Sequence, residues 1–281
     1  MRLLITGAGG MLGQDVHSAA TAAGHQVSAL TRAELDIIDG AAVRAAFEAA
    51  RPDAVINCAA YTQVDKAENE AEAAKQANAV APGVLAGAAA EAGAWLVHVS
   101  TDYVFDGQKT GGPYLESDPV GPRSVYGSTK LEGERAIAAA LPDAHTIVRS
   151  AWLFGLHGPC FPATMLRLAG ERDQLRVVAD QRGCPTYTPH LAGALVSLAE
   201  ARSLVGVVHV AAAGEASWQE FAAATISGAG LDTRVDPIST AEYPTPAARP
   251  AYSVLRSERG APVLPSWQQG LSEYLTARGS A

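Results

Sequence analysis

A glycine-rich loop between a short apolar run and a helical pattern is the strongest constraint on the fold of this chain. Residues Arg2–Thr6 form an apolar run that is typical of a buried parallel strand. Gly7, Gly10 and Gly13 follow, and after the helical pattern a second apolar run occupies Val27–Leu30. This order predicts a βαβ unit in which a dinucleotide diphosphate meets the helix N-terminus. A tight turn without a ligand is the alternative.

Strand and helix patterns alternate over the first 150 residues. Further strands are expected at Ala54–Asn57, Ala94–Ser100 and Thr146–Ser150, separated by alanine-rich helical stretches, one of them interrupted near Ala81–Gly83. The alternation predicts an α/β fold with a doubly wound parallel (Rossmann-like) sheet. Residues Gly206–Ala211 form another β run that could return to this sheet.

The last 130 residues are less regular. Helices are expected at Pro162–Ala169, Pro189–Ala201 and Ser266–Ala277, a strand at Leu175–Ala179, and a loop over the proline-rich stretch Pro237–Pro250.

A chain of 281 residues is long for one simple core. We therefore expect a dinucleotide-binding domain made of residues 1–152 and about 186–213. A smaller, interleaved C-terminal substrate lobe would comprise about 153–185 and 214–281.

Composition narrows the class of partner. The formal net charge of −8 disfavours nucleic acid and anionic membranes as partners. The apolar runs are too short for a membrane span, and the N-terminus is too short for a signal peptide. Cys58, Cys160 and Cys184 are widely spaced and odd in number, which supports neither a disulfide framework nor a zinc site. Reduced cysteines in a cytoplasmic protein are the expectation.

Tyr126 and Lys130 lie four residues apart at the start of a helical pattern. Side chains at this spacing share one helix face, with Cβ atoms roughly 5–6 Å apart. A nearby lysine cation would lower the tyrosine pKa from about 10 and prepare the phenol for proton transfer. An exposed tyrosine and lysine on a surface helix are the alternative.

Thr101 follows the strand expected at Ala94–Ser100, at the edge where parallel sheets bind ligands. A carbonyl reduction needs a hydride donor, a hydrogen bond that polarises the carbonyl, and a proton for the alkoxide. The glycine loop, Thr101, and the pair Tyr126 and Lys130 could supply these three parts. The sequence therefore predicts a dinucleotide-dependent carbonyl reductase.

Over nearly its whole length the chain resembles the extended short-chain dehydrogenase/reductase family, in particular its dTDP-4-dehydrorhamnose reductase branch. The segments that carry the resemblance are Ile5–Gly13, Glu34–Ile37, Asn57–Glu68, Ser100–Gly107, Tyr126–Lys130, Arg149–Trp152, Asp180–Thr186 and Pro244–Pro250. One departure is that a serine expected next to Trp152 is displaced to Ser150.

The resemblance implies NAD(P)H-dependent reduction of the C4 ketone of dTDP-4-dehydro-L-rhamnose to dTDP-L-rhamnose. It implies that Thr101, Tyr126 and Lys130 are catalytic, with Tyr126 protonating the C4 oxygen and Lys130 holding the nicotinamide ribose. The cofactor residues it implies are Gly7, Gly10, Met11, Leu12, Gly13, Thr31, Arg32, Asp36, Ile37, Ala59, Ala60, Tyr61, Tyr126 and Lys130. The substrate residues it implies are Thr101, Asp102, Tyr103, Trp152 as a sugar-pocket wall, and Arg249 as a diphosphate partner or an ordinary surface ion.

The residues after the second strand bear on the choice of cofactor. Thr31 and Arg32 suit a 2′-phosphate and favour NADPH, whereas Glu34 keeps NADH possible. Family members can hold Mg²⁺ at a dimer contact, but the sequence shows no carboxylate cluster for it, so no metal ligand is assigned. The chain could be a monomer or a homodimer.

Two other functions are compatible with the same motifs. One is the reduction of a different dTDP-4-keto-6-deoxysugar. The other is a non-catalytic regulatory subunit that keeps the dinucleotide pocket and binds an enzyme partner. Intact Thr101, Tyr126 and Lys130 favour catalysis.

Overall fold

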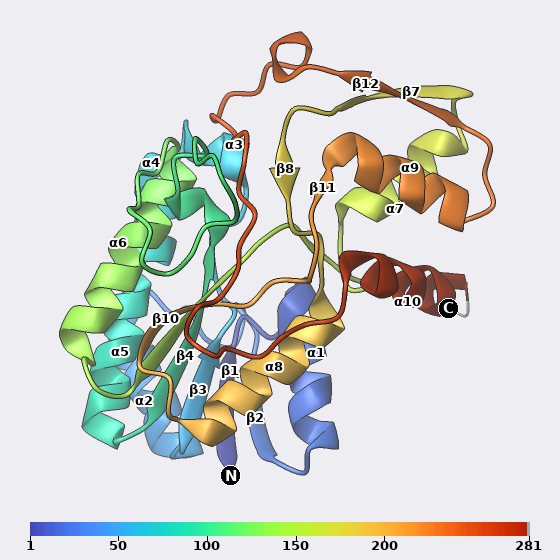
Figure 1. The fold of residues 1–281 in the computed structure, drawn as a ribbon. Coiled ribbons are helices and arrows are strands. Elements are labelled where there is room, and N and C mark those ends of the chain that lie inside the picture. The colour runs from blue at the N-terminus through green and yellow to red at the C-terminus, as the bar shows by residue number, and fades with distance from the viewer. Residues whose placement is uncertain (280–281) are drawn as a thin grey trace.

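A six-stranded parallel sheet forms the centre of the computed structural model, which describes residues 1–279 (Figure 1). The strand order is β10-β5-β4-β3-β1-β2, and every neighbouring pair is parallel. The chain winds one way from β1 to β2 and the other way from β3 onwards, so the switch point lies between β1 and β3. The strands are β1 (Arg2–Thr6), β2 (Gln26–Leu30), β3 (Ala54–Asn57), β4 (Trp95–Thr101), β5 (His145–Ser150) and β10 (Gly206–His209).

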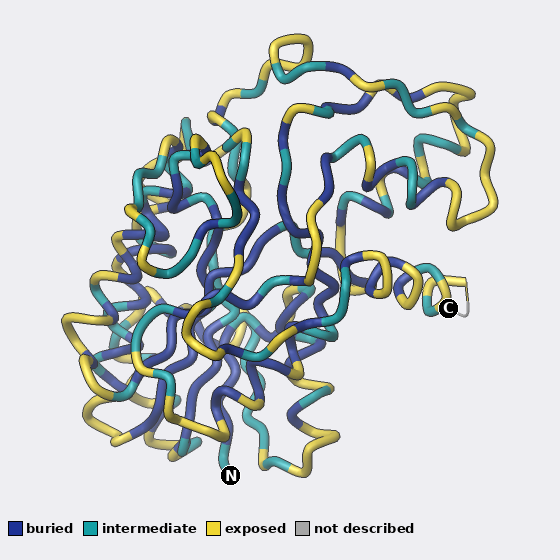
Figure 2. Tube along the Cα trace, in the orientation of Figure 1, coloured by how far each residue is buried: buried dark blue, intermediate teal, exposed yellow. Residues whose placement is uncertain are grey.

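Helices cover both faces of this sheet (Figure 1). Successive strand residues alternate between the faces: Leu3 and Ile5 pack with one helical layer, whereas Leu4 packs with the other. Figure 2 shows buried residues concentrated along β1, β3, β4 and β5. The first layer contains α1 (Met11–Ala22) and α8 (Thr188–Ala201), and the second contains α2 (Gly40–Ala50), α5 (Ala81–Ala92) and α6 (Val125–Ala140). The expected doubly wound sheet is confirmed, including the return of β10.

The remaining elements gather beyond the carboxyl ends of the large sheet (Figure 1). Here β7 and β12 form a parallel pair next to α7 and α9, and separate apolar clusters stabilise this part. The elements are α7 (Phe161–Ala169), β7 (Gln174–Val178), α9 (Trp218–Gly228), β12 (Arg234–Ile238) and α10 (Trp267–Gly279), with the short strands β6 (Leu153–Phe154), β8 (Arg182–Gly183), β9 (Thr186–Tyr187) and β11 (Ala216–Ser217).

The expected interruption at Ala81–Gly83 is wrong. Pro82 lies in the first turn of α5, where a missing N–H costs little, and a π-helical turn over Gln76–Val80 leads directly into that helix. The chain breaks earlier instead, between two short helices, α3 (Val64–Ala67) and α4 (Ala71–Lys75).

Two further expectations differ from the structure in the C-terminal part. Pro237 and Ile238 belong to β12 rather than to a loop, because a two-stranded edge tolerates proline without a ladder N–H. Helix α9 was not expected, although Ser217 and Glu220 form a reciprocal capping box that marks its start.

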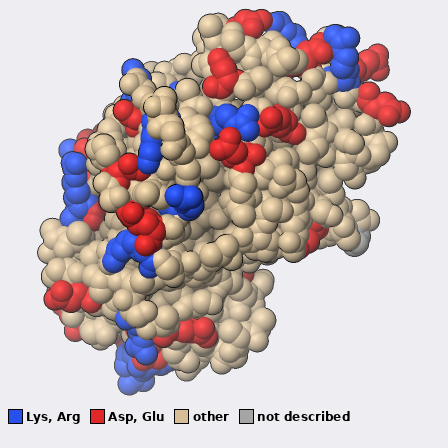
Figure 3. Space-filling model, in the orientation of Figure 1, with Lys and Arg blue, Asp and Glu red and all other residues tan. Residues whose placement is uncertain are grey.

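Charged side chains of both signs are interspersed over the face drawn in Figure 3. Some of the charged side chains form ion pairs: Arg182 is paired with Glu215 at 2.8 Å and with Glu220 at 3.3 Å. No helix within residues 1–279 has both the length and the apolar character needed to cross a bilayer. The three cysteines are free thiols; Cys160 and Cys184 are buried and Cys58 is half-buried.

Candidate active site

The glycine loop is packed too tightly for side chains at two of its positions. Gly7 has a φ of +70°, and a Cβ there would lie 2.5 Å from the backbone N of Ala59. A Cβ on Gly13 would lie 2.2 Å from the carbonyl oxygen of Gly7. Gly10 is the N-cap of α1 and provides no side-chain cap. The backbone N–H groups of Met11 and Leu12, in the first turn, can therefore donate hydrogen bonds to an anion. These features fit a dinucleotide diphosphate.

The end of β3 forms the other side of the switch point. The side-chain oxygen of Asn57 accepts the hydroxyl of Thr6 at 2.7 Å and the backbone N–H of Ala59 at 3.0 Å. Asn57 thereby ties β1 to β3 and shapes the half-buried turn that carries Ala59 and Ala60. The next residue, Tyr61, is held through its backbone by Asn78, which accepts at 2.8 Å and donates at 3.0 Å.

The cofactor residues expected after β2 begin at Thr31, which lies beside the glycine loop. A Cβ on Gly9 would lie 3.4 Å from the methyl of Thr31. The backbone N and hydroxyl of Thr31 both donate to Glu34, at 2.9 and 2.8 Å. These hydrogen bonds lower the pKa of the Glu34 carboxyl, which places an anionic acceptor at the end of β2.

The other three cofactor residues expected after β2 differ in the exposure of their side chains. Arg32 and Asp36 are exposed, whereas Ile37 is buried.

Helix α6 brings Tyr126 alongside the end of β4. Ser124 caps the helix by accepting the N–H of Gly127 at 3.1 Å. Gly127 is required for close approach, because a Cβ there would lie 2.2 Å from the carbonyl oxygen of Tyr103, in the 3₁₀ turn Asp102–Val104. The rings of Tyr103 and Tyr126 meet edge to face with centroids 5.6 Å apart.

The expectation that Lys130 lowers the pKa of Tyr126 is wrong for this structure. Tyr126 is half-buried, and burial of its phenol raises its pKa above the ordinary value, while a hydrogen bond with Thr101 acts in the opposite direction. The Nζ of Lys130 turns to β4 instead, donating to the carbonyl of Val99 at 2.8 Å and contacting Nε2 of His98 at 3.1 Å. Burial lowers the pKa of Lys130 to about 8.

Asp102 is buried next to the expected catalytic residues. The hydroxyl of Thr101 donates to its carboxylate at 3.0 Å and itself accepts the N–H of Tyr103 at 3.2 Å. Burial raises the pKa of Asp102 to about 6. The structure therefore brings Thr101, Asp102, Tyr103 and Tyr126 together at one corner of the sheet.

Trp152 faces a tryptophan that the sequence did not single out. Its ring stacks on Trp218 with centroids 3.5 Å apart and planes 3° apart. A Cβ on Gly183 would lie 2.4 Å from the Trp152 ring, and the indole N–H of Trp218 donates to Gln181 at 3.1 Å. Trp152 has a φ of +49°, a strained backbone for a large side chain, which costs on the order of 1–3 kcal/mol.

Arg249 is more than an ordinary surface ion. It donates to Asp65 at 2.7 Å, and its guanidinium lies 5.9 Å from the ring centroid of Tyr103. Asp65 also accepts the N–H of Ala247 at 3.2 Å, so the segments 57–68 and 244–250 meet here. Within residues 1–279 the buried Nη1 of Arg249 has no hydrogen-bond partner, which leaves one donor for a ligand.

The residues that support the site went unrecognised in the sequence. Asn57, Asn78 and His98 hold the turns around the site, and Glu134 forms a buried ion pair with Arg149. Two signals were present. Glu134 follows Lys130 by one helical turn. Arg149 is the one Asp, Glu, Lys or Arg in the strand expected at Thr146–Ser150, and a charge buried in a strand requires a partner.

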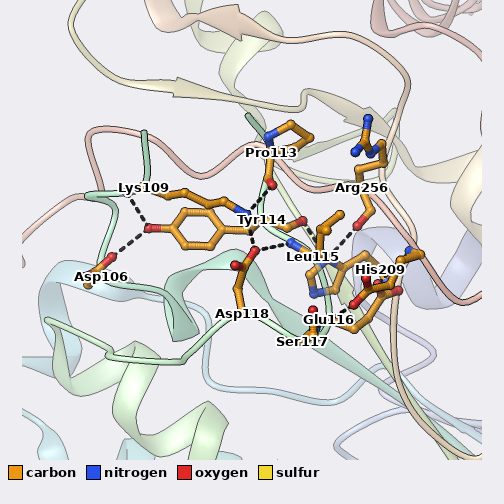
Figure 4. A network of polar contacts seen from close by, with 11 residues as sticks. Asp106, Lys109, Pro113, Tyr114, Leu115, Glu116, Ser117, Asp118, His209 and Arg256 are labelled. Atoms are coloured by element: carbon orange, nitrogen blue, oxygen red, sulfur yellow. Dashed lines mark hydrogen bonds and ion pairs between the residues drawn. The ribbon is translucent and has the colours of Figure 1, made fainter. Parts of the chain in front are cut away.

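The loop 107–123 is held by a polar network that extends from Asp106 to Asp118 (Figure 4). Tyr114 donates to Asp106 at 2.7 Å, and Lys109 pairs with Asp118. Glu116 accepts the N–H of His209 at 2.8 Å. The network ties this loop to the end of β10 and to the C-terminal segment at residue 256.

The sequence model of one protein family, described as the RmlD substrate binding domain, matches residues 1–279. The chain belongs to this family. A dTDP-4-dehydrorhamnose reductase of Mycolicibacterium smegmatis is 48% identical to this RmlD-family chain, covering 98% of it and 85% of the relative. A probable dTDP-4,6-dihydroxy-2-methyloxan-3-one 4-ketoreductase of Streptomyces antibioticus is 43% identical, covering 97% and 94%.

Among solved structures, a dTDP-4-dehydrorhamnose reductase of Bacillus anthracis in complex with NADP superposes on this RmlD-family chain with a TM-score of 0.94. It is 37% identical and covers 98% of this chain and 99% of its own. Within the described residues 1–279, no group of three or more His, Cys, Asp or Glu side chains is arranged to hold a metal ion.

Proposed function

We propose that the chain reduces the C4 ketone of dTDP-4-dehydro-L-rhamnose to dTDP-L-rhamnose with a nicotinamide dinucleotide. The observation that carries this proposal is the meeting of Thr101 and Tyr126 at the carboxyl end of β4, beside the glycine loop at the switch point. The family membership and the names of the relatives support it. A bound nicotinamide dinucleotide would supply the hydride.

The proton comes from the chain itself. Burial keeps the phenol of Tyr126 protonated near neutral pH, so it can donate to the alkoxide that develops on the substrate. The Thr101 hydroxyl, next to that phenol, polarises the same carbonyl oxygen. Lys130 binds the cofactor ribose from its position against β4.

The sugar and its diphosphate would lie between the corner at Asp102 and the stacked tryptophans. Asp102 and Tyr103 offer polar groups to the sugar, and Trp152 offers an apolar wall. The free Nη1 of Arg249 binds the diphosphate.

NADPH is proposed as the main cofactor because the exposed Arg32 can approach a 2′-phosphate at the end of β2. The relative from Bacillus anthracis was solved with NADP. The carboxylate of Glu34, held by Thr31, can accept a ribose hydroxyl instead and keeps NADH as a second cofactor.

A second candidate substrate is another dTDP-linked keto sugar. The relative from Streptomyces antibioticus, named for a different 4-ketoreduction, favours it. The two candidates share the reacting groups and differ in the sugar that must fit against Trp152 and Trp218.

The test is incubation of the purified protein with dTDP-4-dehydrorhamnose and either NADPH or NADH, with product stereochemistry determined by NMR. We expect dTDP-L-rhamnose and faster turnover with NADPH. Cofactor oxidation only with another dTDP-4-keto sugar would favour the second candidate. A folded protein that binds cofactor but turns over neither sugar would overturn both and favour a regulatory subunit.

A further inference from the structure

A buried chain of polar contacts runs from β1 through β3 and β4 to Lys130. Thr6 donates to Asn57 at 2.7 Å, and the side-chain nitrogen of Asn57 contacts Nδ1 of His98 at 2.9 Å. Nε2 of His98 contacts Nζ of Lys130 at 3.1 Å. His98 is fully buried and Lys130 is 2% exposed, so these contacts have no competing solvent.

The orientation of the Asn57 amide is fixed by its backbone neighbour. The N–H of Ala59 can only donate, and it points at the side-chain oxygen of Asn57 at 3.0 Å. If the amide were flipped, the NH₂ group of Asn57 would face the N–H of Ala59, and two hydrogen-bond donors would oppose each other. The NH₂ group of Asn57 therefore faces His98, whose Nδ1 must accept.

An accepting Nδ1 fixes the tautomer of the imidazole. The ring is neutral, because burial lowers the pKa of His98 well below its ordinary value. Its single proton is then on Nε2, which points at Nζ of Lys130. An ammonium group has three donors and no acceptor, whereas an uncharged amine has the lone pair that an Nε2–H requires.

We propose that His98 is a positioning residue for Lys130, which holds Nζ against β4 and, through its Nε2–H, favours the uncharged amine in the free protein. Its consequence for catalysis rests on the proposed reduction. When a cofactor ribose engages Nζ, the amine leaves this contact or takes up a proton. His98 thus sets the pH range in which Lys130 is cationic.

Two other titratable groups near Nζ raise the pKa of Lys130, opposite to the effect proposed for His98. Glu134 on α6 and Cys58 after β3 favour the ammonium form. Glu134 already receives Arg149 at 2.6 Å, which reduces its pull on Lys130. Tyr126 lies one turn earlier on α6. Its pKa is raised, so its phenol is uncharged at neutral pH and does not favour the ammonium form. Burial outweighs these two groups and lowers the pKa of Lys130. The proposed Nε2–H of His98 acts in the same direction as burial.

His98 does not pass the proton further. The amide nitrogen of Asn57 on its other side cannot give up or accept a proton at ordinary pH. The chain of contacts therefore ends at His98, which positions and polarises Lys130 without acting as a relay.

The first measurement reads the tautomer of His98 in the wild-type protein, and a variant serves only for the assignment. ¹⁵N NMR of the histidines in the cofactor-free protein, assigned by comparison with His98→Gln, should place the His98 proton on Nε2. A proton on Nδ1 would overturn the proposal directly.

The second measurement follows the Cε resonance of Lys130, one of only four lysines, as a function of pH. In His98→Gln the amide can turn its oxygen to Nζ, so the Lys130 midpoint should rise by about one pH unit or more. In Asn57→Asp the carboxylate accepts from Nδ1, Nε2 becomes an acceptor, and the midpoint should also rise. The matched control is Thr6→Val, which leaves the Ala59 N–H on Asn57 and should leave the midpoint in place.

Both measurements use the free protein, so they do not depend on turnover. An unchanged midpoint in both His98→Gln and Asn57→Asp would overturn the role of His98 even if the keto sugar is reduced. A raised midpoint without any turnover would leave this inference standing and reject the proposed function. With turnover, the pH profile of kcat/KM in His98→Gln should move in the same direction as the midpoint.

Discussion

The carboxylate of Glu134 receives Arg149 twice, from Nε at 2.9 Å and from Nη2 at 2.6 Å, with both side chains about 5% exposed or less. Ser100 donates to the same carboxylate at 2.5 Å. The pair joins α6 to β5, and Ser100 adds β4, so it fixes the helix one turn after Lys130. This buried cluster stabilises the part of α6 that carries the proposed catalytic residues Tyr126 and Lys130.

Removing only one member of the ion pair between Glu134 and Arg149 should strongly destabilise the folded protein. Arg149→Met leaves Glu134 as an uncompensated buried charge, which should lower the free energy of unfolding by about 3–5 kcal/mol. Urea denaturation measures it. Adding Glu134→Gln should recover part of the loss, because the remaining group is then uncharged. The control is Arg167→Met, which breaks a pair with both side chains more than half exposed and should cost at most about 1 kcal/mol. A loss for Arg149→Met as small as the control's would contradict a structural role.

Stability should depend on pH through Asp102. Its pKa is raised in the folded state to about 6, so the folded protein binds more protons than the unfolded chain between about pH 4 and 6. Stability from this group is therefore present at low pH and is lost as the pH rises through about 6. Asp102→Asn should raise the free energy of unfolding at pH 8 by up to about 3 kcal/mol and flatten the pH dependence below 6.

Chemical denaturation of the wild type and of Asp102→Asn at pH 5 and pH 8 measures this difference. Asp232→Asn, an exposed carboxylate, is the matched control and should change neither value. Equal effects of Asp102→Asn at the two pH values would show that the carboxyl does not titrate in this window.

The main features of the fold follow from local sequence patterns. The strand β1 and the start of α6 lie where apolar runs and turn residues predict them, because a buried parallel strand and a capped helix both leave strong local signals. Helix α9 also has such a local signal, in the capping box of Ser217 and Glu220. The π-helical turn before Pro82 has no comparable local signal, since its geometry depends on packing against α6.

The proximity of the proposed catalytic residues was more predictable than their contacts. Thr101 and Tyr126 were expected to act on one carbonyl group, and the structure brings them together. Their catalytic roles stay predictions. The partner of Lys130 was wrongly expected to be Tyr126, because helix spacing shows which residues share a face but not that His98 lies on the strand below. The stack of Trp152 on Trp218 joins residues 66 positions apart, which no local pattern indicates. The division into two interleaved lobes and the oligomeric state stay predictions.

Removing the phenolic proton should stop the reduction but not cofactor binding. We expect Tyr126→Phe to lower kcat by about 10²–10⁴-fold, the usual contribution of a positioned proton donor. The ring and its edge contact with Tyr103 remain, so the Kd for NADPH, measured by fluorescence titration, should stay within about twofold. Tyr243→Phe removes an exposed hydroxyl as a control. Near-wild-type turnover in Tyr126→Phe would reject Tyr126 as the proton donor.

Arg249 should act on the nucleotide sugar and not on the cofactor. One of its nitrogens is held by Asp65, and its buried Nη1 is free within the described part of the chain. A charge-assisted hydrogen bond to a diphosphate contributes about 1.5–3 kcal/mol, so Arg249→Met should raise the KM for the keto sugar about 10–150-fold. The Kd for NADPH should be unchanged, because the cofactor diphosphate is expected at the N-terminus of α1.

Steady-state kinetics with varied keto sugar at saturating NADPH separates the two effects, and Arg135→Met on the exposed face of α6 is the matched control. Arg249→Lys should recover only part of the loss, since an ammonium cannot bind both Asp65 and a phosphate with the fixed geometry of a guanidinium. If Arg249→Met instead weakens NADPH binding and leaves the KM for the sugar unchanged, then the free nitrogen faces the cofactor, and the assignment of Arg249 to the substrate diphosphate is wrong.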